Sequence, residues 1–232
     1  MATTSPRAVL LDAMGTLLEL EPPAPLLREA LRERLGVLVD EREAVEAMRA
    51  EIAFYRAHHL EGADRAGLSA LRHGCAEELR RQLPALVDAA PEAVLGALLA
   101  SLRFRAYPDA PPTLRALRRA GVRLVAVSNW DVSLHDALRA TGLAPLLDGA
   151  VSSAEAGEDK PAPGIFVRAL ELAGRIKPRD AVHVGDRMDE DVAGAHAAGI
   201  RPILLLREGE PPGGVEHIRS LRALPERIAA SS

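Results

Sequence analysis

Several residue types are scarce in this sequence of 232 residues, and each scarcity excludes a class of protein. A single cysteine, Cys75, allows no disulfide within the chain and favours a reducing compartment. Lys and Arg together number 29 against 33 Asp and Glu, so the chain lacks the basic excess of a non-specific nucleic-acid binder. No apolar run approaches the roughly 18 residues of a membrane span. The apolar run near the N-terminus is also too short for a secretory signal, which predicts a cytoplasmic protein.

Apolar residues make up 48% of the chain, which is enough to build a core. Five short apolar runs are bounded by glycine, proline or charged residues and lack the alternation of half-exposed strands. Runs that alternate with stretches of helical length predict a parallel α/β sheet with helices on both faces and a ligand site beyond the carboxyl ends of the strands. The expected strands are residues 8–13, 122–129, 149–155, 181–186 and 201–206, and the expected helices are 111–120, 132–141, 163–174 and 189–198.

Residues 22 to about 105 interrupt this alternation, because they contain no convincing strand. Prolines mark both boundaries of the segment, since proline neither continues a helix nor donates to a sheet ladder. Amphipathic helices are expected at residues 28–35, 43–60, 68–83 and 93–104. We therefore expect an α/β core formed by residues 1–20 and 106–232, with residues 21–105 as an all-helical insertion after the first strand.

Polar residues that could bind a cation or a substrate follow the first four expected strands. They are Asp12, Ser128, Asn129, Lys160, Asp186 and Asp191. Because parallel strands end at one edge of the sheet, these side chains are expected to converge there. Carboxylates of this kind hold a hard cation, a lysine offsets negative charge, and a serine hydroxyl with backbone amides binds substrate oxygens. The pattern predicts a cation together with a small anionic substrate.

Four motifs occur in a fixed order along the chain: DAMGTL at 12–17, SN at 128–129, KPAPGIF at 160–166 and GDRMDED at 185–191. Each motif is weak alone, but the ordered set is specific. On these motifs the chain resembles the haloacid dehalogenase-like hydrolases with a helical C1-type cap, in a branch whose first motif is DAxGTL. The resemblance covers essentially the whole core and implies a three-layer α/β/α Rossmann-like fold with an all-α cap inserted after strand 1.

The resemblance also implies a role for each matching residue. The implied catalytic residues are Asp12 as nucleophile, Ser128 as a ligand of the transferring group and Lys160 beside the nucleophile. The implied Mg²⁺ site consists of Asp12, the backbone carbonyl of Met14, Asp186 and Asp191. A carboxylate that attacks phosphorus forms an aspartyl-phosphate, which divides a difficult hydrolysis into two steps while Mg²⁺ offsets charge.

Met14 departs from the pattern of the phosphatases that this chain resembles, which usually carry a second aspartate there. That aspartate protonates the leaving alcohol and then activates water, an effect worth about 10²–10⁴-fold. Methionine does neither, whereas a backbone carbonyl ligand does not depend on the side chain. We therefore predict a Mg²⁺-dependent phosphohydrolase of a small phosphorylated metabolite, with reduced or restricted activity.

Two other functions stay open. The first is hydrolysis of a 2-haloacid, because a halide leaving group needs no proton; such dehalogenases usually carry a tyrosine at the position of Met14, need no Mg²⁺ and do not use a pair like Gly185-Asp186. The second is a non-catalytic protein that binds a metal or ligand. Turnover in a chelator would favour the first alternative, and binding without turnover would favour the second.

Several further residues are candidates for substrate contact, each with a plain structural alternative. Asn129 either orders the waters of the metal or holds its loop, Trp130 either lines the pocket or fills the core, and Arg187 either binds a substrate anion or points to solvent. In the helical insertion the candidates are Tyr55, Arg56 and His59, against the alternative of an ordinary helix surface. The chain is expected to be a monomer or a homodimer.

Overall fold

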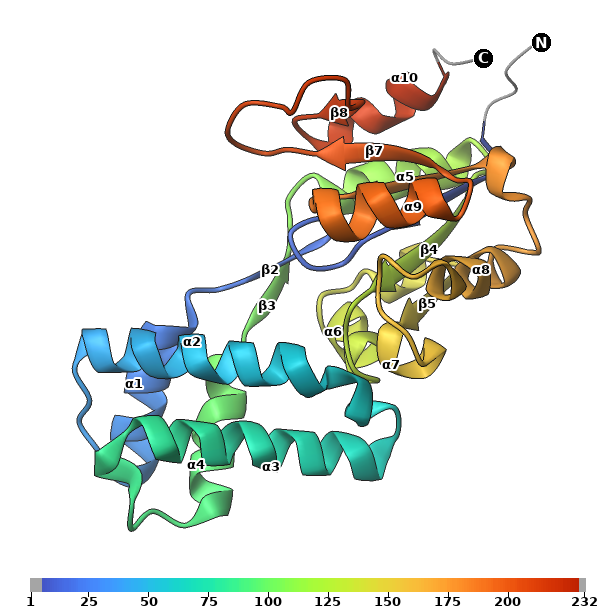
Figure 1. Ribbon diagram of the computed structural model, residues 1–232. Helices are drawn as coiled ribbons and strands as arrows, with labels where there is room; N and C mark the ends of the chain where they lie inside the picture. The colour runs from blue at the N-terminus through green and yellow to red at the C-terminus, as the bar shows by residue number, and fades with distance from the viewer. Residues whose placement is uncertain (1–5, 230–232) are drawn as a thin grey trace. The chain divides into compact units, whose positions relative to one another are not determined.

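The computed structural model describes residues 6–229 and divides into two compact units (Figure 1). One unit comprises Met1–Glu19 and Ala106–Ser232, and the other comprises Leu20–Arg105. Within the described range, no helix combines the length and the apolar character needed to cross a membrane.

A six-stranded parallel sheet forms the centre of the first unit, with strand order β5-β4-β1-β6-β7-β8. The strands are β1 Ala8–Leu11, β4 Arg123–Ser128, β5 Gly149–Ser152, β6 Ala181–Gly185, β7 Arg201–Leu205 and β8 His217–Ile218. All five expected strands are present. Strands β1 and β6 are buried at every residue, which explains why their sequences do not alternate. The two-residue edge strand β8 is too short to leave a periodic signal.

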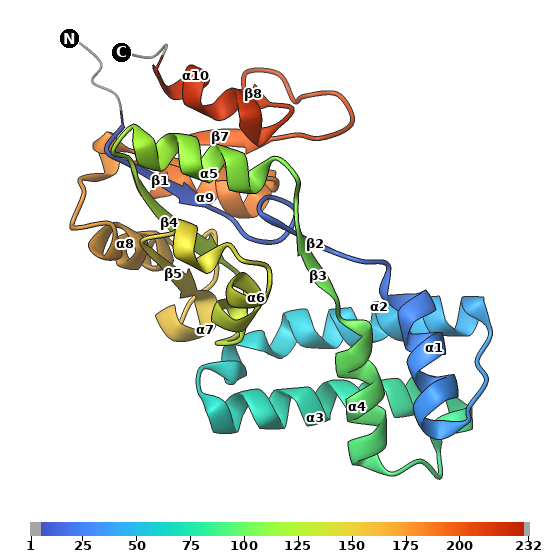
Figure 2. The same cartoon turned by 180° about the vertical axis from the view of Figure 1, so that it is seen from behind.

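Helices cover both faces of this sheet, which confirms the three-layer α/β/α fold (Figures 1 and 2). Helices α8 and α9 lie on one face, where Leu10, Val125 and Val127 form a buried cluster with Phe166 and Ala195. Helix α5 lies on the opposite face. The helices of this unit are α5 Ala110–Arg119, α6 Leu134–Ala140, α7 Ser153–Ala156, α8 Pro163–Leu172, α9 Ala193–Ala197 and α10 Leu224–Ala229.

The helix expected at residues 189–198 starts differently from the prediction. Met188–Val192 form a π-helical turn, and the α-helix α9 begins only at Ala193. The backbone N–H of Val192 donates to the carbonyl of Arg187 at 3.1 Å, which is the wider π spacing. Single π turns of this kind occur often at functional sites, and this one carries Asp191.

The second unit is a bundle of four helices: α1 Pro23–Leu35, α2 Glu41–His58, α3 Arg65–Gln82 and α4 Pro91–Ser101. Its buried core includes Leu27, Leu31, Met48, Leu79 and Leu98. Asp40 caps the N-terminus of α2 in a capping box: the Asp40 carboxylate accepts from the Glu43 N–H at 2.8 Å, and the Glu43 carboxylate accepts from the Asp40 N–H at 3.3 Å.

The expectation that residues 22 to 105 contain no strand is wrong at one end. Helix α4 ends at Ser101 rather than at residue 104, and β3 Phe104–Ala106 follows it. This strand pairs with β2 Leu18–Leu20 as a two-stranded sheet. The chain therefore passes between the units through β2 and β3. A ladder between two three-residue strands so distant in sequence leaves no local pattern.

Candidate active site

The carboxyl edge of the parallel sheet gathers the expected polar residues. Asp12 follows β1, Ser128 ends β4, and Asp186 follows β6. These three strands are neighbours, so their ends lie side by side. Lys160 comes from the loop after α7, and Asp191 comes from the π-helical turn after β6.

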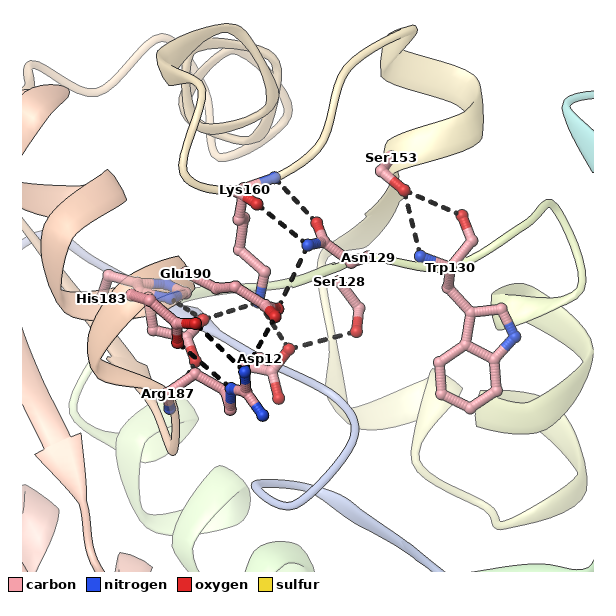
Figure 3. A network of polar contacts seen from close by, with 11 residues as sticks. Asp12, Ser128, Asn129, Trp130, Ser153, Lys160, His183, Arg187 and Glu190 are labelled. Atoms are coloured by element: carbon pink, nitrogen blue, oxygen red, sulfur yellow. Dashed lines mark hydrogen bonds and ion pairs between the residues drawn. The ribbon is translucent and has the colours of Figure 1, made fainter. Parts of the chain in front are cut away.

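Lys160 lies between two carboxylates at the centre of the site (Figure 3). Its Nζ atom donates to Oδ1 of Asp12 and to Oδ1 of Asp191, each at 2.6 Å, and its side chain is 1% exposed. The hydroxyl of Ser128 also donates to Oδ1 of Asp12, at 3.1 Å. One oxygen of Asp12 is thus fixed by an ammonium and a hydroxyl, which orients the other oxygen.

Asn129 holds the lysine loop in place through two backbone contacts. Its Nδ2 atom donates to the Lys160 carbonyl at 3.0 Å, and its Oδ1 atom accepts from the Lys160 N–H at 2.8 Å. Nδ2 also donates to Oε2 of Glu190 at 3.1 Å (Figure 3). These contacts favour the structural alternative for Asn129, which is to hold the loop.

Asp191 accepts hydrogen bonds on both of its oxygens. Oδ1 accepts from Lys160 and from Nε2 of His183 at 2.9 Å, and Oδ2 accepts from the Arg187 N–H at 3.0 Å. Burial alone would raise the pKa of Asp191, but Lys160 and the hydrogen bond from His183 outweigh it and hold this pKa well below its usual range. Asp191 is therefore ionised and anchors Lys160.

His183 is a part of the site that the sequence analysis missed. It lies in the middle of β6, is 0% exposed, and stacks edge-on against Phe166 at 5.0 Å between ring centroids. Burial lowers its pKa, so it is neutral and donates from Nε2 to Asp191. A histidine inside an otherwise apolar buried strand was the available signal.

Three carboxylates face a single ammonium in this cluster. Asp12, Asp186 and Asp191 each offer an oxygen within 4.8 Å of the others, and Lys160 forms ion pairs with two of them, Asp12 and Asp191. Burial, with the neighbouring carboxylates, raises the pKa of Asp12 to about 7 against the opposing effect of Lys160, and raises the pKa of Asp186 to about 6. The cluster has an excess of negative charge.

Two observations show that this cluster fits a hard divalent cation. Oδ2 of Asp12 is buried and has no hydrogen-bond partner among residues 6–229. A Cβ atom on Gly15, whose φ is +83°, would lie 2.2 Å from Oδ2 of Asp186, so only glycine allows this close approach. Carboxylate oxygens gathered in this way are the ligands that Mg²⁺ prefers.

The chain is similar to known proteins of one family. The family model for haloacid dehalogenase-like hydrolases matches residues 6–199. The chain belongs to this family. It is 33% identical to a glyceraldehyde 3-phosphate phosphatase of Methanopyrus kandleri over 210 residues. The aligned region covers 87% of this chain and 84% of that protein. Several other curated relatives match over only 40% to 62% of their length.

Two solved structures of similar fold differ in their chemistry. A haloacid dehalogenase-family phosphatase from Thermococcus onnurineus is 26% identical with a TM-score of 0.66, covering 96% of this chain and 97% of that one. A 2-haloacid dehalogenase from Pseudomonas syringae pv. tomato DC3000 is also 26% identical with a TM-score of 0.67, covering 97% and 99%. The chain is thus a haloacid dehalogenase-like hydrolase by sequence and by fold.

Two further candidates for substrate contact, Trp130 and Arg187, also have partners within the protein. Trp130 is 6% exposed, its indole N–H donates to the Ser133 hydroxyl at 3.3 Å, and its backbone N–H donates to the Ser153 hydroxyl at 3.1 Å. These contacts favour a role in bracing the loop after β4. The guanidinium of Arg187, which is half exposed, pairs with Asp189 at 3.1 Å.

The candidates in the helical unit also have local contacts. Tyr55 and Arg56 lie on α2, and His59 follows this helix with 5% exposure. The His59 ring lies 3.0 Å through Nδ1 from the Arg56 carbonyl, and the His58 ring lies 2.8 Å from the Phe54 carbonyl and stacks on the Phe54 ring. His58 and His59 each contact a backbone carbonyl of α2, which favours the structural alternative for His59.

Replacing Lys160 by methionine is expected to destabilise the protein by about 3–5 kcal/mol, the usual cost of leaving a buried ion pair without one partner. In the variant the buried carboxylates of Asp12 and Asp191 lose their only cationic partner among the described residues and keep only their hydrogen bonds from Ser128, His183 and the Arg187 N–H, so their pKa values in the folded state rise above the unfolded values. Groups of this kind stabilise the fold at low pH, and the contribution is lost as the pH rises through the folded pKa. The loss in the free energy of unfolding of Lys160→Met relative to wild type is therefore larger at pH 8 than at pH 5. Urea unfolding of both proteins in EDTA at the two pH values measures this difference.

Lys177 provides the matched control, because it is an exposed lysine on the same unit. Lys177→Met is expected to change the free energy of unfolding by less than about 0.5 kcal/mol. Combining Lys160→Met with Asp191→Asn should recover part of the loss. A Lys160→Met variant as stable as Lys177→Met at both pH values would show that the ion pairs are not formed.

Proposed function

We propose that this hydrolase is a Mg²⁺-dependent phosphohydrolase of a small phosphorylated metabolite, which acts through an aspartyl-phosphate on Asp12. The observation that carries this proposal is the asymmetry of the Asp12 carboxylate. Oδ1 is held by Lys160 and Ser128, whereas Oδ2 is buried and has no partner in the described part of the chain, and Asp12 itself belongs to a cluster of three acidic residues. An oriented carboxylate with one uncommitted oxygen suits nucleophilic attack.

Asp12, Asp186 and the backbone carbonyl of Met14 would hold the Mg²⁺ ion, with Asp191 completing the acidic cluster. When bound, the ion supplies positive charge that offsets the phosphoryl oxygens. The three hydrogen bonds that Asp191 accepts favour an indirect part for it, which is to fix Lys160.

In the first step an oxygen of Asp12 bonds to phosphorus, and the bond from phosphorus to the leaving oxygen breaks. Lys160 and the Ser128 hydroxyl hold the carboxylate for this attack and stabilise negative charge next to it. In the second step water attacks phosphorus, releases inorganic phosphate and restores the Asp12 carboxylate. Because Met14 supplies no proton, the leaving oxygen takes its proton from solvent or from the substrate itself, which restricts the enzyme to good leaving groups.

The helical unit is proposed to act as a cap that closes over the site and selects the substrate, with the core at residues 1–20 and 106–232 and the cap at residues 21–105. Residues Tyr55, Arg56 and His59 are its candidate contacts, and Trp130 and Arg187 are those of the core. The relative that acts on glyceraldehyde 3-phosphate, by its name, supports a small phosphorylated substrate. A cytoplasmic monomer or homodimer without a nucleic-acid partner completes the proposal.

Hydrolytic dehalogenation of a 2-haloacid is the second candidate. Met14 favours it, because halide departs without a proton, and the solved 2-haloacid dehalogenase supports it through its similarity. The acidic cluster at Asp12, Asp186 and Asp191 counts against it, since displacement of halide needs no cation. A binding protein without turnover is the third candidate.

The experiment that separates these functions compares two substrates with and without metal. The proposal predicts that a chromogenic aryl phosphate is hydrolysed in Mg²⁺ and not in EDTA, and that 2-chloropropionate releases no chloride in either buffer. Chloride release that persists in EDTA would identify a dehalogenase. Mg²⁺ binding with no turnover of either substrate would identify a binding protein.

A further inference from the structure

In the turn that follows Asp12, two backbone carbonyls accept hydrogen bonds from outside the turn. Within the turn, the carbonyl of Ala13 accepts from the N–H groups of Leu17 and Leu18 at 2.9 and 2.8 Å. The carbonyls of Gly15 and Thr16 instead accept from the guanidinium of a residue almost two hundred positions later, Arg207.

Arg207 follows β7 and donates hydrogen bonds to the turn from two of its nitrogens. Nη2 donates to the Thr16 carbonyl at 2.9 Å, and Nε donates to the Gly15 carbonyl at 3.4 Å. The guanidinium lies over the ring of Tyr107, 3.7 Å from its centroid. A planar guanidinium that is stacked and hydrogen-bonded in this way has one orientation, which a lysine does not reproduce.

Asp109 holds the other side of the guanidinium. Its carboxylate accepts from Nη1 and Nη2 of Arg207 at 3.0 and 3.1 Å, from the Ser220 hydroxyl at 2.7 Å and from the Leu221 N–H at 3.0 Å. Asp109 is 7% exposed, so this pair is largely withdrawn from solvent. Asp109 therefore fixes the orientation of the Arg207 guanidinium independently of its contacts with the turn.

The position of the turn sets the geometry of the acidic cluster. Gly15 lies against Asp186, since a Cβ atom there would come within 2.2 Å of its Oδ2 atom. Met14 directly precedes Gly15 in the chain, and Asp12 lies three positions before it. A shift of the turn therefore moves the nucleophile and the backbone carbonyl of Met14 relative to Asp186.

We propose that Arg207, held by Asp109, is a positioning residue that fixes the turn at residues 13–18 and thereby sets the cation affinity and the reactivity of the Asp12 site. This inference rests on the proposed function, because it takes Asp12 and its neighbours as the cation and nucleophile site. The hydrogen bonds of Arg207 go to Gly15, Thr16 and Asp109, so it acts on Asp12 through the turn.

Arg201, the first residue of β7, offers a matched control. It is a half-buried arginine at the opposite end of β7, and it pairs with Glu216 through two hydrogen bonds at 2.5 and 2.8 Å. Arg201→Met and Arg207→Met thus each remove one doubly hydrogen-bonded, partly buried ion pair. Only Arg207→Met also releases the turn after Asp12.

The test measures three properties of wild type, Arg207→Met, Arg207→Lys and Arg201→Met: Mg²⁺ affinity by calorimetry, hydrogen exchange of a peptide spanning residues 12–20, and turnover of an aryl phosphate. Arg207→Met is expected to bind Mg²⁺ about 10–100-fold more weakly and to lose about 10²-fold in kcat/KM. Its 12–20 peptide should exchange faster. Arg207→Lys should resemble Arg207→Met, and Arg201→Met should match wild type in all three properties.

The outcomes separate this inference from the proposed function. If Arg207→Met matches Arg201→Met in Mg²⁺ affinity and in exchange, the inference is overturned, whatever the turnover. If wild type binds Mg²⁺ but hydrolyses no phosphate, the proposed function fails, while weaker binding and faster exchange in Arg207→Met still support the positioning role. If Arg201→Met loses as much Mg²⁺ affinity and turnover as Arg207→Met, the loss follows from removal of any such ion pair, and the inference also fails.

Discussion

Replacing Met14 by aspartate is expected to raise the hydrolysis of alkyl phosphates by about 10²–10⁴-fold, the usual contribution of a positioned general acid–base. The residue two positions after Asp12 lies in the turn that starts the acidic site, and it is half-buried there. A carboxyl group at this position would give the leaving oxygen its proton and then activate the attacking water. Aryl phosphates should gain less, because their leaving groups need little protonation.

Met14→Asn is the matched control, since its side chain has nearly the shape of aspartate but has no acidic proton. It is expected to stay at the wild-type rate, and the ratio of alkyl to aryl phosphate rates should change only in Met14→Asp. Steady-state kinetics in Mg²⁺ measure this ratio for wild type and for both variants. If Met14→Asp and Met14→Asn are equally slow on a broad panel of phosphates, the phosphohydrolase account loses its main support.

The fold could be predicted from the sequence because its signals are local. Five short apolar runs separated by helical stretches correspond to β1, β4, β5, β6 and β7, and the burial of every residue of β1 and β6 explains why their sequences do not alternate. The short strands β2, β3 and β8 could not be predicted, because segments of two or three residues are defined by distant partners. The π-helical turn at Met188–Val192 was likewise beyond a helical pattern.

The convergence of the site residues could be predicted for the same reason: in a parallel sheet, strand order alone places the strand ends together. The contacts of Lys160 with Asp12 and Asp191 bear out that convergence. The supporting residues could not be predicted, since His183 and Arg207 act through pairings set by the tertiary fold. The sequence predicted which groups meet, and the structure adds what holds them.

Replacing Asp12 by asparagine is expected to abolish turnover. An oriented nucleophile reaches effective molarities of about 10⁵ M or more, and the amide neither attacks phosphorus nor pairs as a carboxylate with Lys160. Asp148 gives a matched control on the same sheet, because it is a partly buried aspartate that pairs with Arg123 before β5. Asp148→Asn is expected to lose some stability and to keep wild-type kcat/KM.

The measurement that tests the central claim most directly is the Mg²⁺-dependent hydrolysis of a chromogenic aryl phosphate by wild type, Asp12→Asn and Asp148→Asn. The account predicts turnover for wild type and Asp148→Asn in Mg²⁺, none in EDTA, and only background for Asp12→Asn in either buffer. Wild-type turnover that Asp12→Asn retains, or that EDTA leaves unchanged, would contradict it.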